Sequence, residues 1–193
     1  MKGLEEAAEP PLRVYLLGAH STGKTTLARR IAAVFGLTIV TEVARTVLAE
    51  SSTTLPALRI DLDRTKAYQM EVAKRQVIAE NVAGPRFVSD RACDNLAYAA
   101  LHTTALREIL QELDVEKYMQ RLRGPHAAVF FVRPHPSLVK VDGTRTVDWD
   151  EILQLDGMIR WLLEAHDVNY VSLSTPSMVD RWRTVLAVLE TRR

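Results

Sequence analysis

One eight-residue segment near the start of the chain limits the possible fold more than any other feature. The residues from Gly18 to Thr25 read GAHSTGKT and fit the pattern G-x-x-x-x-G-K-[ST] at every fixed position. An apolar run at residues 14–17 precedes them, and apolar residues recur at helical spacing after Lys24. Glycines let such a loop turn tightly, so that successive N–H groups face a phosphate at the start of the helix. The segment therefore predicts a strand–loop–helix unit that binds a nucleoside triphosphate.

The positions of this loop have different expected roles. Lys24 should reach the β- and γ-phosphate oxygens, and the Thr25 hydroxyl should ligate Mg²⁺. His20 lies in the variable part of the loop, where the backbone is expected to matter more than the imidazole ring. ATP and Mg²⁺ are therefore the expected ligands. The residues expected to contact the nucleotide are Gly18, Ala19, His20, Ser21, Thr22, Gly23, Lys24, Thr25 and Thr26.

Short apolar runs alternate with longer helical stretches along the chain, which is typical of an α/β fold with a parallel sheet. This pattern predicts a doubly wound, five-stranded parallel sheet with helices on both faces. Strands are expected at residues 14–17, 37–40, 86–90, 127–132 and 168–173. Helices are expected at residues 24–36, 42–50, 63–82, 95–101, 105–123, 149–165 and 177–189, with a polar break at 51–56.

The length of 193 residues suits one domain. Residues 1–11 are expected to form a flexible leader, and residues 12–193 a single P-loop kinase domain. The polar segment at about 134–148 is the candidate for a lid. The chain has one cysteine and no apolar run of signal-peptide or membrane-helix length, which favours a reducing, cytoplasmic location.

The overall charge is close to zero, with 25 Lys and Arg residues against 24 Asp and Glu residues. This balance gives no support to nucleic-acid or membrane binding over the whole surface. Positive charge that serves function should therefore be local.

Three classes of P-loop protein lack support in the sequence. There is no Asn-Lys-x-Asp motif of a G-protein and no Ser-Gly-Gly-Gln-like signature of a transporter ATPase. Motor and AAA-type ATPases usually have a Glu after the strand-terminal Asp, where this chain has Arg91 after Asp90. A small kinase that phosphorylates a bound acceptor is the class that remains.

Further candidates follow the other strands, at the edge where α/β sheets hold their ligands. Asp90 could bind Mg²⁺ and Arg91 a phosphate or the acceptor. Glu42 could accept the proton of an attacking hydroxyl or simply begin a helix. Arg45 could bind the acceptor, and Tyr68 could contact it or serve in helix packing.

Positive residues in or beside the candidate lid could stabilise the charge of the transferred phosphoryl group. These residues are Arg133, Lys140 and Arg145, of which Arg145 is the preferred candidate. Thr175 and Arg181 are candidates for the adenine pocket by position alone.

The segment Leu17–Ala28, the sequence TEVAR at 41–45 and DGTR at 142–145 resemble the nicotinamide-riboside-kinase-like group of P-loop kinases. That resemblance implies phosphorylation of a ribosyl hydroxyl with MgATP. The segment 89–98 resembles the Asp-Arg stretch of thymidylate kinases, although no aromatic residue follows Arg91. Glu42 with Asp90-Arg91 is similar to the deoxynucleoside kinase plan, with Asp in place of Glu before the arginine.

The sequence thus predicts ATP- and Mg²⁺-dependent phosphoryl transfer to a nucleoside-like or nucleotide-like small molecule. Two alternatives stay open. The acceptor could be a hydroxyl on a polynucleotide or modified base, or the chain could be a regulatory nucleotide-binding module that transfers nothing. The oligomeric state is also left open.

Overall fold

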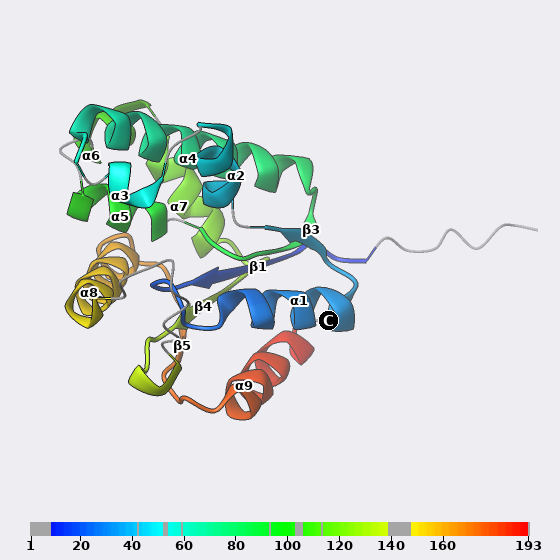
Figure 1. Cartoon of the computed structure of the whole chain (residues 1–193). Coiled ribbons are helices and arrows are strands. Elements are labelled where there is room, and N and C mark those ends of the chain that lie inside the picture. The colour runs from blue at the N-terminus through cyan, green and yellow to red at the C-terminus, as the bar shows by residue number, and fades with distance from the viewer. Residues whose placement is uncertain are drawn as a thin grey trace, which may run out of the picture.

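Five parallel strands form one sheet in the computed structural model, which describes residues 9–41, 43–51, 54–58, 60–92, 94–102, 106–112, 114–138 and 148–192. At positions 55, 56, 102 and 112 only the backbone is described. The strands are β1 (Leu12–Leu17), β2 (Thr38–Val40), β3 (Arg86–Ser89), β4 (Ala127–Val132) and β5 (Val171–Leu173). Their order is β2-β3-β1-β4-β5, so the strand that leads into the glycine-rich loop is central (Figure 1). The predicted fold class is confirmed.

The central strands are apolar on both faces because both faces of the sheet are covered. Successive side chains of β1 alternate between the two sides, as strand geometry requires. Tyr15 and Leu17 belong to one hydrophobic core, and Val14 and Leu16 to the other. The two cores hold the sheet between two layers of helices.

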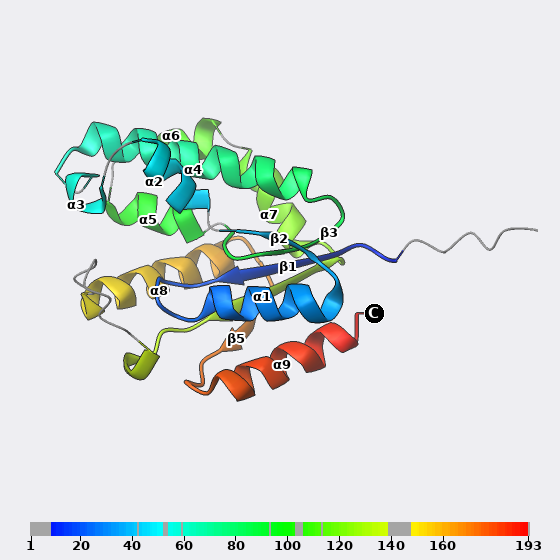
Figure 2. The same cartoon turned by 45° about the vertical axis from the view of Figure 1, so that its right-hand side comes forward.

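Figure 2 shows one layer below the sheet, formed by α1 (Lys24–Phe35) and α9 (Met178–Glu190). The other core is closed by α4 (Leu62–Val82), α5 (Asp94–His102), α7 (Val115–Arg123) and α8 (Trp149–Ala165). The shorter elements are α2 (Val43–Glu50), α3 (Leu55–Leu58), α6 (Leu106–Glu112) and the 3₁₀ helix η1 (Pro136–Leu138). None of the helices in the described ranges has both the length and the apolar character that crossing a membrane requires.

Most boundaries lie within two residues of the sequence prediction, and three features differ more. The helix expected over 105–123 is two helices, because the Asp114 side chain accepts from the Lys117 amide and begins α7. The helix α3 starts at Leu55, inside the expected polar break. The last strand begins at Val171 because the Val168 amide donates to the Leu163 carbonyl at the end of α8.

Residues 9–11, at the end of the proposed leader, lie beside the start of β3. The Arg86 guanidinium is 2.7 Å from the Glu9 carboxylate and donates to the Pro10 carbonyl oxygen over 2.6 Å.

A buried polar cluster connects α4, β3 and α7. Gln76 Nε2 donates to Glu80 Oε1 and to Ser89 Oγ, each over 2.8 Å, and the Tyr118 hydroxyl donates to the same Glu80 oxygen over 2.9 Å. Burial raises the pKa of Glu80 from 4.5 to about 7, although the hydrogen bonds from Gln76 and Tyr118 oppose the shift. Glu80 therefore binds a proton more tightly in the folded chain than in the unfolded one.

This shift predicts that the free energy of unfolding falls as pH rises from 5 to 8. Between pH 4.5 and 7 the folded state holds a proton that the unfolded state has released, so Glu80 contributes stability at the acid end and loses it by the alkaline end. We expect this decrease to be smaller by about 2 kcal/mol in Glu80→Gln. Urea unfolding at pH 5 and at pH 8 measures the decrease in the free energy of unfolding for each protein. Asp63→Asn, an exposed change on the same helix, should follow the wild type, and an equal decrease in Glu80→Gln would contradict the assignment.

Candidate functional site

The loop from Gly18 to Thr25 joins the carboxyl end of β1 to α1, and its shape depends on glycine at two positions. A Cβ on Gly18 would lie 2.3 Å from the carbonyl oxygen of Val132, at the end of β4. Gly23 has a φ of 94°, in the left-handed region that other residues rarely adopt. Both fixed glycines of the motif are therefore required by the backbone itself.

Lys24 lies against this loop. Its ammonium group donates to the carbonyl oxygens of Gly18 and Ala19 over 2.8 and 2.7 Å, and the side chain is almost fully buried. The Thr22 hydroxyl also donates to the Ala19 carbonyl, over 3.0 Å. A positive charge is thus held within the turn of the loop, where the oxygens of a phosphate could replace the two carbonyl partners.

Thr25 and Asp90 meet at the carboxyl edge of the sheet. The Thr25 hydroxyl donates to Asp90 Oδ2 over 2.5 Å, although the residues are 65 positions apart. Asp90 is buried, and its amide donates to the Val40 carbonyl over 3.0 Å, which fixes the end of β3 against β2. The structure therefore brings together a hydroxyl of the loop and a carboxylate from the neighbouring strand.

Arg91 is held beside this pair by two contacts on α5. Its guanidinium lies 3.3 Å from the buried Asp94 carboxylate and 5.4 Å from the centroid of the Tyr98 ring. The Tyr98 hydroxyl accepts from the His20 amide over 3.1 Å, and burial raises its pKa, so it stays protonated at neutral pH.

Tyr98 thus connects the glycine-rich loop to the Asp90-Arg91 segment, a link that the sequence reasoning missed. The available signal was its position one helical turn after Asp94, on the same face of the helix.

Arg133 was expected to act with the candidate lid, and the structure shows it paired with a residue of α8. It directly follows β4, and its guanidinium binds both carboxylate oxygens of Asp156 on α8, over 2.9 and 2.6 Å. Asp156 is buried, and burial raises its pKa while the arginine opposes the rise. Arg133 therefore joins the end of β4 to α8, because a buried carboxylate needs a charged partner.

Arg181, an adenine-pocket candidate by position, is fully buried. From α9 its guanidinium group donates to three backbone carbonyl oxygens, those of Thr22 over 2.5 Å, Arg133 over 2.8 Å and Thr175 over 2.5 Å. These carbonyls follow β1, β4 and β5. The arginine therefore fixes three loops of the site relative to one another.

The remaining candidates are dispersed. Ser21 and Thr26 are exposed on the loop and the first turn of α1, and Arg45 is exposed on α2. The Tyr68 hydroxyl donates to the Ala44 carbonyl over 3.0 Å, which corresponds to the helix-packing alternative. Glu42, Lys140 and Arg145 lie outside the described residues, as do Cys93 and the stretch 139–147 of the proposed lid.

A parallel sheet of this order, with a glycine-rich loop after its central strand, defines an α/β protein of the P-loop class. A family model described as an AAA domain matches residues 13–181, which is most of the chain. The chain belongs to this AAA domain family. No curated protein matches it significantly in sequence.

Solved structures share the fold. A NadR protein in complex with NR is 21% identical with a TM-score of 0.61, over 94% of this chain and 51% of that one. Deoxyadenosine kinase from M. mycoides with bound dATP is 13% identical with a TM-score of 0.60, over 93% and 100%. Shikimate kinase from Acinetobacter baumannii in complex with shikimate is 15% identical with a TM-score of 0.54, over 95% of each chain. This chain thus spans about half the length of the NadR chain.

These matches establish the fold of P-loop kinases. The family is described as an AAA domain, whereas AAA-type ATPases were set aside on the sequence because Arg91 follows Asp90. The match establishes family membership and does not decide between ATP hydrolysis and phosphoryl transfer. The arginine itself stands where such ATPases have an acidic residue. None of the three structures above is a thymidylate kinase, so that resemblance stays a prediction.

Proposed function

We propose that this chain transfers the γ-phosphoryl group of ATP, with Mg²⁺, to a nucleoside-like or nucleotide-like small molecule. The contact between the Thr25 hydroxyl and Asp90 carries the proposal, because it joins a phosphate loop to a carboxylate at the ligand edge of the sheet. The fold supports it, since similar structures include a kinase with bound dATP and a protein in complex with NR.

The residues present suit Mg²⁺. This ion takes oxygen ligands and is usually held by one or two carboxylates together with substrate phosphates and water. The Thr25 hydroxyl and the Asp90 carboxylate provide such oxygens. No cluster of three or more His, Cys, Asp or Glu side chains suited to a metal occurs in the described ranges. When bound, Mg²⁺ neutralises charge on the β- and γ-phosphate oxygens.

Asp90→Asn should raise the Mg²⁺ concentration that gives half-maximal activity by about tenfold or more. The amide can still accept from the Thr25 hydroxyl, so the local structure is kept while the negative charge is lost. Titration of activity with Mg²⁺ at saturating ATP measures the change. Glu190→Gln, an exposed change on α9, should leave the titration unaltered. An unaltered titration in Asp90→Asn would remove Asp90 from the metal site.

We assign the other groups according to the chemistry of transfer. Lys24 and the loop amides hold the triphosphate, and Arg91 meets charge on the transferred group or the acceptor. Glu42 receives the proton when the acceptor is a hydroxyl. When the acceptor is a monophosphate, no strong base is needed, and Arg45 or Arg91 binds that phosphate instead.

The same proposal includes one kinase domain over residues 12–193, with a leader at 1–11 and a lid at about 134–148. Lys140 and Arg145 would approach the phosphates from that lid. Arg133 holds α8 instead, as its contacts with Asp156 indicate.

An acceptor screen with γ-labelled ATP tests the function. The acceptors are nucleosides, nucleoside monophosphates, nicotinamide riboside and oligonucleotides. Label in a nucleoside or a nucleotide supports the proposal, and the labelled acceptor shows whether a hydroxyl or a monophosphate receives the phosphoryl group. Label in oligonucleotides alone would replace it with the polynucleotide alternative. Slow hydrolysis without any labelled acceptor, together with nucleotide-dependent partner binding, would favour the regulatory module.

A further inference from the structure

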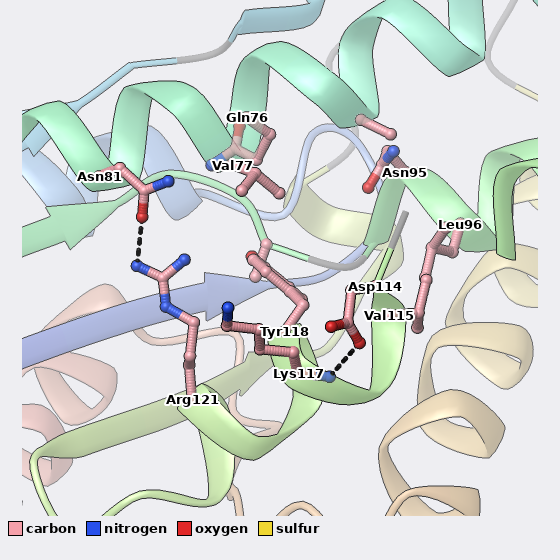
Figure 3. Close-up of a pocket in the computed structure, with 12 residues that line it drawn as sticks. Gln76, Val77, Asn81, Asn95, Leu96, Asp114, Val115, Lys117, Tyr118 and Arg121 are labelled. Atoms are coloured by element: carbon pink, nitrogen blue, oxygen red, sulfur yellow. Dashed lines mark hydrogen bonds between the residues drawn. The ribbon is translucent and has the colours of Figure 1, made fainter. Parts of the chain in front are cut away.

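A cavity of about 550 Å³ lies among α4, α5 and α7, on the face of the sheet away from α1 and α9 (Figure 3). This volume is in the range of small-molecule sites. Among the described residues, no member of the glycine-rich loop lines it. The lining residues are Ala73, Gln76, Val77, Asn81, Ala92, Asn95, Leu96, Asp114, Val115, Lys117, Tyr118 and Arg121.

Asn95 gives the cavity an unused hydrogen-bond donor. The residue is 7% exposed, and its Nδ2 is buried without a hydrogen-bond partner in the part of the chain that the structure describes. Burying an amide N–H group without an acceptor costs free energy, which an acceptor atom of a ligand would recover. Nδ2 itself has almost no exposed area, so a carbonyl or similar oxygen of a ligand would accept from Asn95 once the side-chain amide turns toward this end of the cavity.

Positive charge lies on the α7 side. Lys117 and Arg121 are one turn apart on this helix, and Asp114 is the single acidic residue of the lining, which leaves a net charge of +1 (two positive, one negative). Arg121 donates to Asn81 Oδ1 over 2.7 Å, with one of the five N–H groups of a guanidinium. Figure 3 shows Arg121 and Asn81 at one end and Asn95 at the other.

The walls between these two ends contain apolar side chains, including Val77, Leu96 and Val115. We propose that the cavity binds a small organic anion whose carboxylate meets Lys117 and Arg121, whose apolar body packs against these walls, and whose far end accepts from Asn95. Binding at this site does not depend on the proposed kinase activity.

The ligand would contact the segment that carries Asp90 and Arg91. Ala92 directly follows Arg91, Asn95 lies next to Asp94 on α5, and the Ala92 amide donates to Asp94, the partner of Arg91. Gln76 binds Ser89, the residue before Asp90. A bound anion should therefore change the affinity for an ATP analogue a few-fold, and the nucleotide should change the affinity for the anion by the same factor.

Nuclear magnetic resonance of the whole chain tests the site with a panel of para-substituted benzoates, beginning with 4-acetamidobenzoate. We expect the side-chain amide signal of Asn95 and the backbone signals of α7 to shift on titration. The neutral analogue 4-acetamidobenzamide should bind about tenfold more weakly because it has no carboxylate to form ion pairs with Lys117 and Arg121.

Two variants should weaken 4-acetamidobenzoate binding. Asn95→Leu removes the buried donor. Arg121→Gln removes the positive charge of a partly exposed side chain, so this variant still tests the site if Asn95→Leu does not fold. We expect about a tenfold loss in each. Gln120→Ala, an exposed change on the same helix, should bind like the wild type. The site is refuted if no benzoate shifts the Asn95 signal, if the benzamide binds equally well, or if both variants bind like the wild type. An unchanged nucleotide affinity would refute the coupling.

Discussion

Lys24→Ala should lower phosphoryl transfer by about a thousandfold while the chain stays folded. The ammonium group lies within the turn of the loop, bonded to the Gly18 and Ala19 carbonyls. Alanine leaves the backbone free to keep its turn but supplies no cation where charge develops on the γ-phosphoryl group. Single-turnover rates with saturating ATP measure the loss, and circular dichroism checks the fold.

Arg29→Ala is the matched control for this change. Arg29 is an exposed cation on the same helix, so its removal alters the net charge equally without touching the loop. Its transfer rate should stay close to that of the wild type. If Lys24→Ala retained full activity, the loop would not be the site of the triphosphate.

The second large effect is on stability. Arg181→Met should lower the free energy of unfolding by about 3–5 kcal/mol, because three buried carbonyls lose their charged donor at once. Methionine fills much of the same space, so the loss reports mainly the hydrogen bonds to Thr22, Arg133 and Thr175. Arg181→Lys should recover little, since a single ammonium group lacks the planar fork that reaches three loops. Urea unfolding measures both variants.

Arg183→Met provides the comparison on the same helix. Its side chain is 74% exposed and pairs with Asp180, so the change should cost less than about 1 kcal/mol. If Arg181→Met were no more costly than Arg183→Met, Arg181 would not fix the loops of the site.

The sequence predicted those parts of the fold whose signal is local. The strand Ala127–Val132 was predicted to the residue because it is apolar at every position, as a strand covered on both faces must be. The glycine-rich loop was equally clear because its residue types follow from its own backbone. The break between α6 and α7 was missed because the helical spacing continues across it, while a single Asp114 cap begins a new helix.

Contacts between distant residues explain what could not be predicted. Thr25 was expected near the ligand from the glycine-rich motif and Asp90 from its place at the end of a strand, and the sheet order brought them together. No sequence pattern indicates that Arg133 pairs with Asp156, so the arginine was assigned to the lid. Likewise, position alone suggested an adenine contact for Arg181, whose three carbonyl partners become visible only in the folded chain.

The bond from Arg181 to the Thr22 carbonyl has a consequence for how the chain is made. The two residues are 159 positions apart, so the glycine-rich loop leaves the ribosome long before its anchor on α9 does. Until α9 has been synthesised and packed, the loop lacks the donor that holds it against the ends of β4 and β5. A nascent chain that ends before α9 therefore contains the whole phosphate-binding motif without this donor, and we expect nucleotide binding to develop only once α9 has packed.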